Sequence, residues 1–432
     1  MFTSLESLVL KKAIVSFEGM SLSSSSSSSS SSLTTASCRK LFPHLQSLIV
    51  KECDGVNGLP WQMLSSLKAL KIKASRGLQG QVPGCLRNLN SLTSLKIKGL
   101  KIENTNMAAQ QQQLGGLVPN LRQLKIECCK NMGFLLDVLL HIPSLWTLTI
   151  SKCGGPVSLS ALGHLSFLTD ISLEEVEIKV EGVTPVFPSL LNLRLAYASM
   201  IYQNMLSSSS SSSSETTQNL NHFPKLTNLT IACHEVNGLH WPLFSALKYL
   251  TIINSPRLDD HLLLGCLNAF SALTSLKLTG VKIKTFHAEL MATPNALGYL
   301  QFRDCNELIS VEGLHALPSL RSLWIIKCPQ FRTLSMEHII EQGVFLPKLS
   351  QILIDSCENL ESLPAWVPHL PLLISLTITK CPKFHSLPEG GLPASLRSLT
   401  IRNCDPSLME RCQQEGSCDW LMIEHILEQI YK

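Results

Sequence analysis

The chain has 432 residues, of which 45% are hydrophobic and 16% are charged, and its formal net charge is +4. So small a charge on so long a chain gives no electrostatic reason to expect a nucleic-acid partner. The fifteen cysteines are an odd number spread along the chain, whereas a secreted disulfide framework is denser and usually even-numbered. We therefore expect reduced thiols and a cytoplasmic location.

The first twenty residues do not predict a signal peptide, because they lack a basic start and Glu6, Lys11 and Lys12 interrupt any apolar run. No stretch of eighteen apolar residues predicts a membrane span. A strand-like phrase begins already at Leu5, without a polar segment before it. Its apolar edge would need a cover. We therefore expect either a fragment or truncated product, or an edge that docks on something.

From Leu5 onward the phrase L-x-x-L-x-apolar recurs along the chain, as in Leu121-Leu124-Ile126 and Leu320-Leu323-Ile325. Most copies are 21 to 29 residues apart, which is the period of leucine-rich repeats. Sixteen copies are found, and their first positions are 5, 45, 67, 92, 121, 145, 168, 190, 226, 247, 273, 297, 320, 349, 373 and 396.

Within each copy the apolar residues alternate, so they share one face of a short strand. A single such strand cannot bury its leucines, but stacked neighbours form a continuous parallel sheet over a continuous core. The pattern predicts an α/β leucine-rich-repeat solenoid. We expect a curved parallel sheet of about sixteen short strands on the concave face and an irregular convex side.

A cysteine follows the last apolar residue of the phrase by three positions in eight copies. Regularly spaced cysteines suggest a metal site or a redox function. Metal ligands, however, must converge on one point, whereas these cysteines occur once in each repeat. Leucine-rich repeats use a small residue such as Asn or Cys at this slot, so we interpret the cysteines as a structural ladder. In four late copies an apolar residue follows the cysteine by six positions, which predicts a return segment without a long helix. The ladder comprises Cys53, Cys129, Cys153, Cys305, Cys328, Cys357, Cys381 and Cys404.

A longer echo with an offset near 180 residues links FPHLQSLIV at 42–50 to FPKLTNLTI at 223–231. Two serine runs are echoed as well, and poly-serine has nothing to bury, so we expect disorder there. The echo predicts a single domain over 1–432. Its parts are a first seven-repeat block at 1–189, a duplicated block at 190–372, last repeats at 373–404, a C-terminal cap at 405–432, and disordered serine-rich insertions at 21–37 and 207–219.

The outward residues of the strands should line the concave face, where solenoids usually bind. One group is basic, and solvated surface charge is the simpler interpretation for it. A second group contains aromatic residues and an arginine, which are enriched at interaction hot spots. The candidate protein-binding residues are Lys51, Lys71, Lys73, Lys96, Lys98, Lys125, Tyr249, Tyr299, Arg303 and Trp324.

Motifs of catalysis are missing from the sequence: no phosphate loop, no dinucleotide-binding glycine motif and no His-Glu-x-x-His is present. His287-Ala288-Glu289 resembles the His-x-Glu element of zinc deaminases, but the Pro-Cys-x-x-Cys element that those enzymes also need does not follow it. We therefore predict a protein that is not an enzyme and that has neither a cofactor nor a metal.

These repeats resemble the leucine-rich region of plant intracellular nucleotide-binding leucine-rich-repeat receptors, the disease-resistance proteins of the coiled-coil class. The tail, with Arg411-Cys412, Gly416, Asp419-Trp420 and His425-Ile426, is similar to the ending L-x-x-R-C…G-x-D-W-x-x-I-x-H-I of that family. The resemblance implies an interaction module that contributes to recognition of a pathogen effector and to autoinhibition. Its partner would be an effector, a host guardee or its own nucleotide-binding domain.

The sequence departs from this family because the nucleotide-binding and coiled-coil domains are absent from it, so we expect a fragment or a truncated form. One alternative is a leucine-rich-repeat substrate adaptor for ubiquitination, which would need an F-box-like helical segment before the first repeat. Another is a stand-alone regulator or decoy. A third alternative is a cell-surface receptor ectodomain, but plant versions carry the phrase L-x-G-x-I-P in each repeat, and this phrase is not found.

Overall fold

The structure of the chain is a computed structural model. The chain forms two compact units, unit 1 (Met1–His222) and unit 2 (Phe223–Lys432). The serine-rich segments 21–37 and 207–219 lie outside the described residues. The described ranges are 4–13, 42–53, 59, 61, 64–74, 86, 89–100, 118–130, 142–181, 186–203, 223–232, 244–255, 263, 267–268, 270–291, 296–335 and 346–431.

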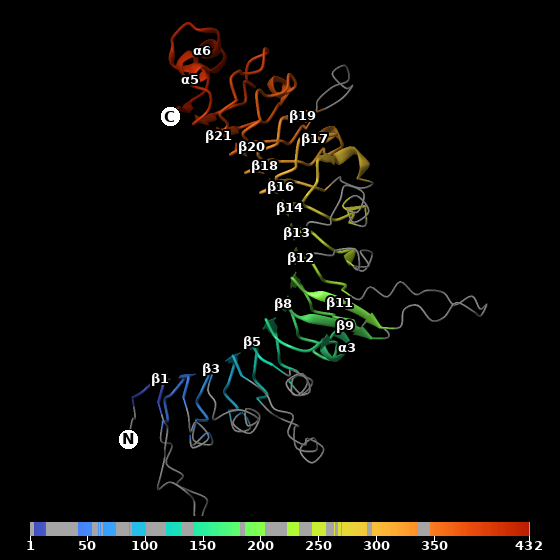
Figure 1. Cartoon of the computed structure of the whole chain (residues 1–432), viewed down its shortest axis with the longest axis vertical. Helices are drawn as coiled ribbons and strands as arrows, with labels where there is room; N and C mark the ends of the chain where they lie inside the picture. The colour runs from blue at the N-terminus through green and yellow to red at the C-terminus, as the bar shows by residue number, and fades with distance from the viewer. Residues whose placement is uncertain are drawn as a thin grey trace, which may run out of the picture. The chain divides into compact units, whose positions relative to one another are not determined.

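In unit 1 the main sheet is a ladder of parallel five-residue strands, shown from blue to green in Figure 1. Each strand pairs with the next in perfect register. The strands are β1 (Ser7–Lys11), β2 (Ser47–Lys51), β3 (Ala69–Lys73), β4 (Ser94–Lys98), β5 (Gln123–Glu127), β6 (Thr147–Ser151), β8 (Asp170–Glu174) and β10 (Asn192–Ala196).

In unit 2 the main strands form a second ladder, in which each strand again pairs in parallel and in register with the next, from yellow to red in Figure 1. It contains β12 (Asn228–Ala232), β13 (Tyr249–Ile253), β14 (Ser275–Thr279), β16 (Tyr299–Arg303), β18 (Ser322–Ile326), β20 (Gln351–Asp355), β21 (Ser375–Thr379), β22 (Ser398–Arg402) and β23 (Glu428–Tyr431). All sixteen predicted strands are therefore present, and β23 is an additional one.

The core follows from the alternation inside each strand. From β2 to β22 the second and fourth residues of the main strands are buried, as with Leu48 and Val50 in β2. Burying such an aliphatic side chain contributes roughly 1.5–3 kcal/mol. Because the register is unbroken, each apolar residue lies over its counterpart in the next repeat. The fold class is thus confirmed as a parallel leucine-rich-repeat solenoid.

A tight turn with a left-handed residue ends the main strands. Lys327 has φ of 54°, and its N–H donates to the carbonyl of Asp355 on the next strand at 2.7 Å. Equivalent bonds join Glu52 to Lys73 at 2.8 Å and Gly280 to Arg303 at 2.8 Å. The turn therefore adds a hydrogen bond between repeats beyond the strand ladder.

The outer side of the solenoid carries short parallel strands of its own. Unit 1 has β7 (Val157–Ser158), β9 (Glu177–Glu181) and β11 (Ser199–Gln203), and unit 2 has β15 (Thr285–His287), β17 (Ser310–Glu312) and β19 (Thr333–Ser335). The prediction of an irregular convex side is incomplete here. Val311 and Leu334, which follow ladder cysteines by six positions, are buried at the centres of β17 and β19. Their alignment brings the flanking backbones close enough to pair.

The C-terminal segment folds as a cap on unit 2. It contains α5 (Pro406–Gln413), α6 (Cys418–Ile423) and β23, which pairs with β22. Asp405 caps α5 by accepting from Ser407 N at 2.9 Å, and Ser417 caps α6 by accepting from Trp420 N at 3.0 Å. Such caps satisfy N–H groups that a helix start leaves unbonded.

Candidate protein-binding surface

The first, third and fifth residues of the main strands point away from the core and form what we call the exposed strand face. This is the face that the sequence predicts to be the binding surface. Register makes each position a column of neighbours across the repeats. Strands lie about 4.8 Å apart, so side chains in one column can touch directly.

Lysines dominate the exposed strand face over β2 to β5 in unit 1. Lys71, Lys96 and Lys125 are consecutive neighbours in the third column. Lys51, Lys73 and Lys98 are consecutive in the fifth column, which then continues to Glu127. The structure therefore brings together all six lysines predicted from the sequence as two adjoining rows.

Glu127 gathers three of these lysines around one carboxylate. Its oxygens lie 2.9 Å from Lys96 Nζ, 3.0 Å from Lys98 Nζ and 2.9 Å from Lys125 Nζ. Burial by itself would raise the pKa of Glu127, but hydrogen bonds from Lys125, Lys96 and Lys98 hold it at about 2. The same contacts raise the pKa of Lys98. Three lysines face one glutamate, so the group keeps an excess of positive formal charge.

In unit 2 an aromatic cluster occupies the exposed strand face. Tyr299, at the first position of β16, and Trp324, at the third position of β18, meet edge to face with ring centroids 5.3 Å apart. Lys277 Nζ lies 5.3 Å from the centre of the Tyr299 ring. The Tyr299 hydroxyl donates to Gln301 Oε1 at 2.6 Å. Burial raises the pKa of Tyr299. We call these four residues the aromatic cluster.

The other two residues predicted for this group lie apart from the Tyr299–Trp324 pair. Tyr249 is in the same column as Tyr299, but Ser275 of β14 stands between them. The side chain of Tyr249 is exposed. Arg303 lies at the fifth position of β16, at the other end of the strand from Tyr299. Both remain on the exposed strand face, outside the aromatic cluster.

Some residues with interaction chemistry were not singled out from the sequence. Lys277 reaches the Tyr299 ring because β14 and β16 align in register, and Gln301 contacts Tyr299 from two positions later on the same strand. Trp146 in unit 1 precedes β6, is 46% exposed, and lies under the guanidinium of Arg122 with 4.8 Å from Cζ to the ring centre. The sequence signal that could have identified Trp146 is its position directly after Leu145, the first leucine of its phrase.

The eight ladder cysteines are buried, reduced thiols. Each donates through Sγ to the carbonyl of the residue two positions earlier, at distances between 3.1 and 3.7 Å. For Cys404, burial raises the pKa to about 11. Each sulfur therefore bonds to a backbone carbonyl at the turn of its own repeat.

The ladders define the class of this protein: a leucine-rich-repeat solenoid, which is typically a non-enzymatic scaffold for protein interactions. Among the described residues, no helix is long and apolar enough to cross a membrane. No protein-family model matches the chain. A relative is a candidate disease resistance protein of Arabidopsis thaliana, 32% identical over 183 residues, with 35% of this chain and 13% of that protein covered. The chain thus spans only 13% of the length of this curated relative.

Solved structures of other repeat proteins are similar in part. TLR13 in its complex with ssRNA13 is 16% identical, with 90% of this chain and 56% of that chain covered and a TM-score of 0.48. A leucine-rich-repeat protein of Leptospira interrogans is 14% identical, with 85% and 91% covered and a TM-score of 0.38. InlJ of Listeria monocytogenes, whose functional domain includes a cysteine ladder, is 15% identical, with 83% and 69% covered and a TM-score of 0.44. The strand ladders themselves establish the leucine-rich-repeat fold.

Proposed function

We propose that this chain is the protein-interaction module of a plant intracellular immune receptor, acting in effector recognition and autoinhibition in the cytoplasm. Two observations support the receptor class: the stretch that is 32% identical to the Arabidopsis protein, and the tail phrase around Arg411 and Asp419. The partner would be a pathogen effector, a host protein that the effector modifies, or the receptor's own nucleotide-binding domain.

The aromatic cluster is the observation that carries the interaction role. Tyr299 and Trp324 are only partly buried, although each offers a large apolar ring and a polar tip. Such side chains contribute most to protein interfaces when a partner removes the remaining water. Their contact with each other, and the hydrogen bond to Gln301, hold the rings in place before binding. Little conformational freedom would then be lost in the complex.

The proposal is tested by expressing the chain and the nucleotide-binding domain of a coiled-coil-class resistance receptor as separate polypeptides. We expect the two to co-purify. The double variant Tyr299→Ala/Trp324→Ala should weaken binding at least tenfold, since truncation of a hot-spot aromatic residue costs about 2 kcal/mol or more.

Thr377→Ala/Thr400→Ala is the matched control, because both threonines lie in the third column of the same ladder, on β21 and β22. It should bind like the wild type. Circular dichroism confirms that each variant is folded. Equal binding by wild type and a folded aromatic double variant would remove the cluster from the proposed interface. Failure of the wild type to bind would contradict the autoinhibitory part of the proposal.

A further inference from the structure

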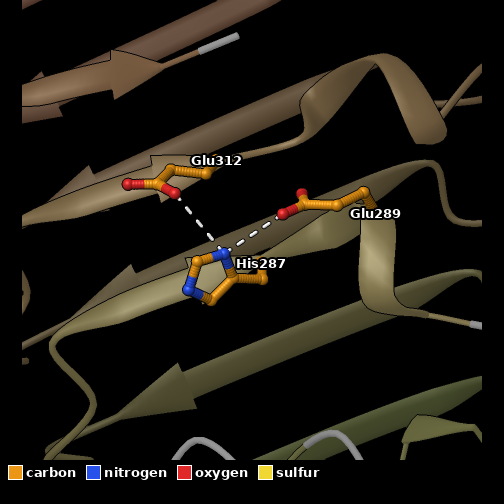
Figure 2. Close-up of side chains that lie close together, drawn as sticks. All are labelled: His287, Glu289 and Glu312. Carbon is orange, nitrogen blue, oxygen red and sulfur yellow. Dashed lines mark hydrogen bonds and ion pairs between the residues drawn. The ribbon is translucent and has the colours of Figure 1, made fainter. Parts of the chain in front are cut away.

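Three metal-binding side chains meet on the outer ladder of unit 2, away from the exposed strand face. Figure 2 shows His287 at the end of β15, Glu312 at the end of β17, and Glu289 in the 3-10 turn η7 (Ala288–Leu290). His287 Nδ1 lies 3.1 Å from Glu289 Oε1 and 3.4 Å from Glu312 Oε2. All three ligand atoms lie within 4.8 Å of one another.

The backbone places these groups because their neighbours are anchored in the core. Phe286 and Val311 are buried and lie opposite each other in the β15–β17 pair, so His287 and Glu312 are directly paired on the outer side. Ala288 is also buried and starts η7, which turns Glu289 back toward the histidine.

Each carboxylate is held so that one oxygen faces the imidazole. Ser310 Oγ donates to Glu312 Oε1 at 2.7 Å, which leaves Oε2 toward His287. The other oxygen of Glu289 lies over Gly313, where a Cβ would come within 1.3 Å of it and 2.7 Å from the Glu289 backbone nitrogen. Gly313 has φ of 67° as well. A glycine is thus required for this position of the Glu289 carboxylate.

From this geometry we propose that His287, Glu289 and Glu312 form a binding site for a divalent transition-metal ion of the Zn²⁺ type. Zn²⁺ binds imidazole nitrogen and carboxylate oxygen at about 2.0–2.2 Å, and a tetrahedron of that size has edges of roughly 3.4 Å. The two nitrogen-to-oxygen distances, 3.1 and 3.4 Å, match those edges.

The charge and the exposure of the group fit the same ion. An imidazole that coordinates a metal ion is neutral, so this ligand set with its two carboxylates would carry two negative charges, which a divalent cation balances. About one third of each side chain is exposed, so a water molecule can take the fourth position. The hydrogen bond from Ser310 is the kind of outer contact that orients a ligand. Because the ligands come from successive repeats, the ion would join those repeats and stabilise the folded state.

Sequence inspection could not find this site. His287 and Glu289 are two positions apart in one repeat, and without the rest of a deaminase motif this spacing does not indicate a metal site. Glu312 belongs to the following repeat. Only the parallel register of β15 and β17 brings it beside His287.

The test uses the full chain treated with a chelator, after alkylation of exposed thiols such as Cys128 and Cys418, which would otherwise bind zinc. Calorimetric titration with Zn²⁺ should reveal a site that His287→Ala loses. Glu289→Gln and Glu312→Gln keep the side-chain size and should bind at least tenfold more weakly. Zn²⁺ should also raise the Tm of the wild type and leave the Tm of His287→Ala unchanged.

Two further variants separate a built site from adventitious binding. His369→Ala removes an exposed histidine in the 3-10 turn η9 (Val367–His369) and should retain the wild-type affinity. Gly313→Ala keeps all three ligands but displaces the Glu289 carboxylate, and should lose affinity. Equal Zn²⁺ stoichiometry and affinity in wild type and His287→Ala would overturn the proposal and leave an imidazole that only hydrogen-bonds two carboxylates.

Discussion

Glu127 determines how the lysines of unit 1 present their charge. In the sequence, Glu127 is a single acidic residue among the outward lysines of these strands. In the structure three ammonium groups converge on its carboxylate, which is only 12% exposed. The lysine side chains are 30–45% exposed, so solvent screens part of their attraction. Glu127 therefore positions these lysines as well as neutralising part of their charge.

We expect Glu127→Gln to lower the free energy of unfolding by about 1 kcal/mol at pH 7, after allowance for that screening. The folded-state pKa of about 2 is below the ordinary value of 4.5. The stabilisation is therefore fully present above pH 4.5 and is lost as the pH falls toward 2. Urea unfolding at pH 7 and at pH 3 measures the difference, which should shrink at pH 3.

Glu175→Gln provides the control for this prediction, because Glu175 pairs with Lys152 at 3.3 Å while both side chains are about half exposed. Its effect should stay below about 0.5 kcal/mol at either pH. An equal loss in the two variants would show that the convergence of three lysines on Glu127 does not contribute.

Lys327 has a left-handed backbone conformation, which its residue type does not indicate. A lysine near a strand end looks like ordinary surface, yet its φ is 54°. Left-handed conformations of non-glycine residues cost about 1–2 kcal/mol, and a β-branched side chain is least tolerated there. Lys327→Val should lower the free energy of unfolding by about 1–2 kcal/mol, as measured by urea unfolding, whereas Lys327→Gly should be nearly neutral.

Thr377→Val is the comparison for Lys327→Val, because Thr377 is at an extended strand position where valine is favoured. It should be neutral or slightly stabilising. If valine were equally tolerated at both positions, the hydrogen bond of the Lys327 N–H to Asp355 would not depend on the left-handed turn.

At the scale of elements, the sequence was sufficient to predict a strand wherever the L-x-x-L-x-apolar phrase places two buried apolar residues at alternate positions. It failed for β23, whose residues Glu428-Gln429-Ile430-Tyr431 lack the phrase and become a strand by pairing with β22. The outer strands β15, β17 and β19 have three residues each, too few for a pattern. The Tyr299–Trp324 contact depends on cross-strand register, so listing the two residues could not establish that they touch.

The cap gives a physical reason for the tail phrase on which the family resemblance rests. Arg411 Nε donates to Asp419 Oδ2 at 2.5 Å, and its Nη2 donates to the carbonyl of His385 at 2.6 Å. Asp419 and Cys412 are buried. Gly416 has φ of 80°, which lets the chain turn between α5 and α6. The phrase thus specifies how two short helices close on the last repeats.

Arg411→Ala should lower the free energy of unfolding of unit 2 by about 2 kcal/mol, because it leaves the buried Asp419 carboxylate without its cation. Since repeats contact only their neighbours, the effect should concentrate at the cap. Hydrogen exchange should become faster in β22, β23 and α6 and stay unchanged in β12 and β13. Arg397→Ala, at an exposed arginine of the same region, should leave exchange unaltered; a uniform change across unit 2 would contradict a local role.

At the scale of the molecule, each unit displays a different surface chemistry on one type of ladder. Unit 1 carries the rows of lysines, and unit 2 carries the aromatic cluster on its exposed strand face. The solenoid keeps outward side chains in fixed columns, so substitutions there change the surface without changing the core. This separation allows a leucine-rich-repeat module to vary its partner while keeping its fold.

The central claim, that the aromatic cluster contacts a protein partner, is tested most directly by hydroxyl-radical footprinting. The chain is oxidised alone and in the presence of the nucleotide-binding domain of a coiled-coil-class resistance receptor. Our account predicts that oxidation of Tyr299 and Trp324 falls severalfold in the complex, while oxidation of Trp420 in α6 does not change. A complex in which Tyr299 and Trp324 are oxidised as fast as in the chain alone would contradict it.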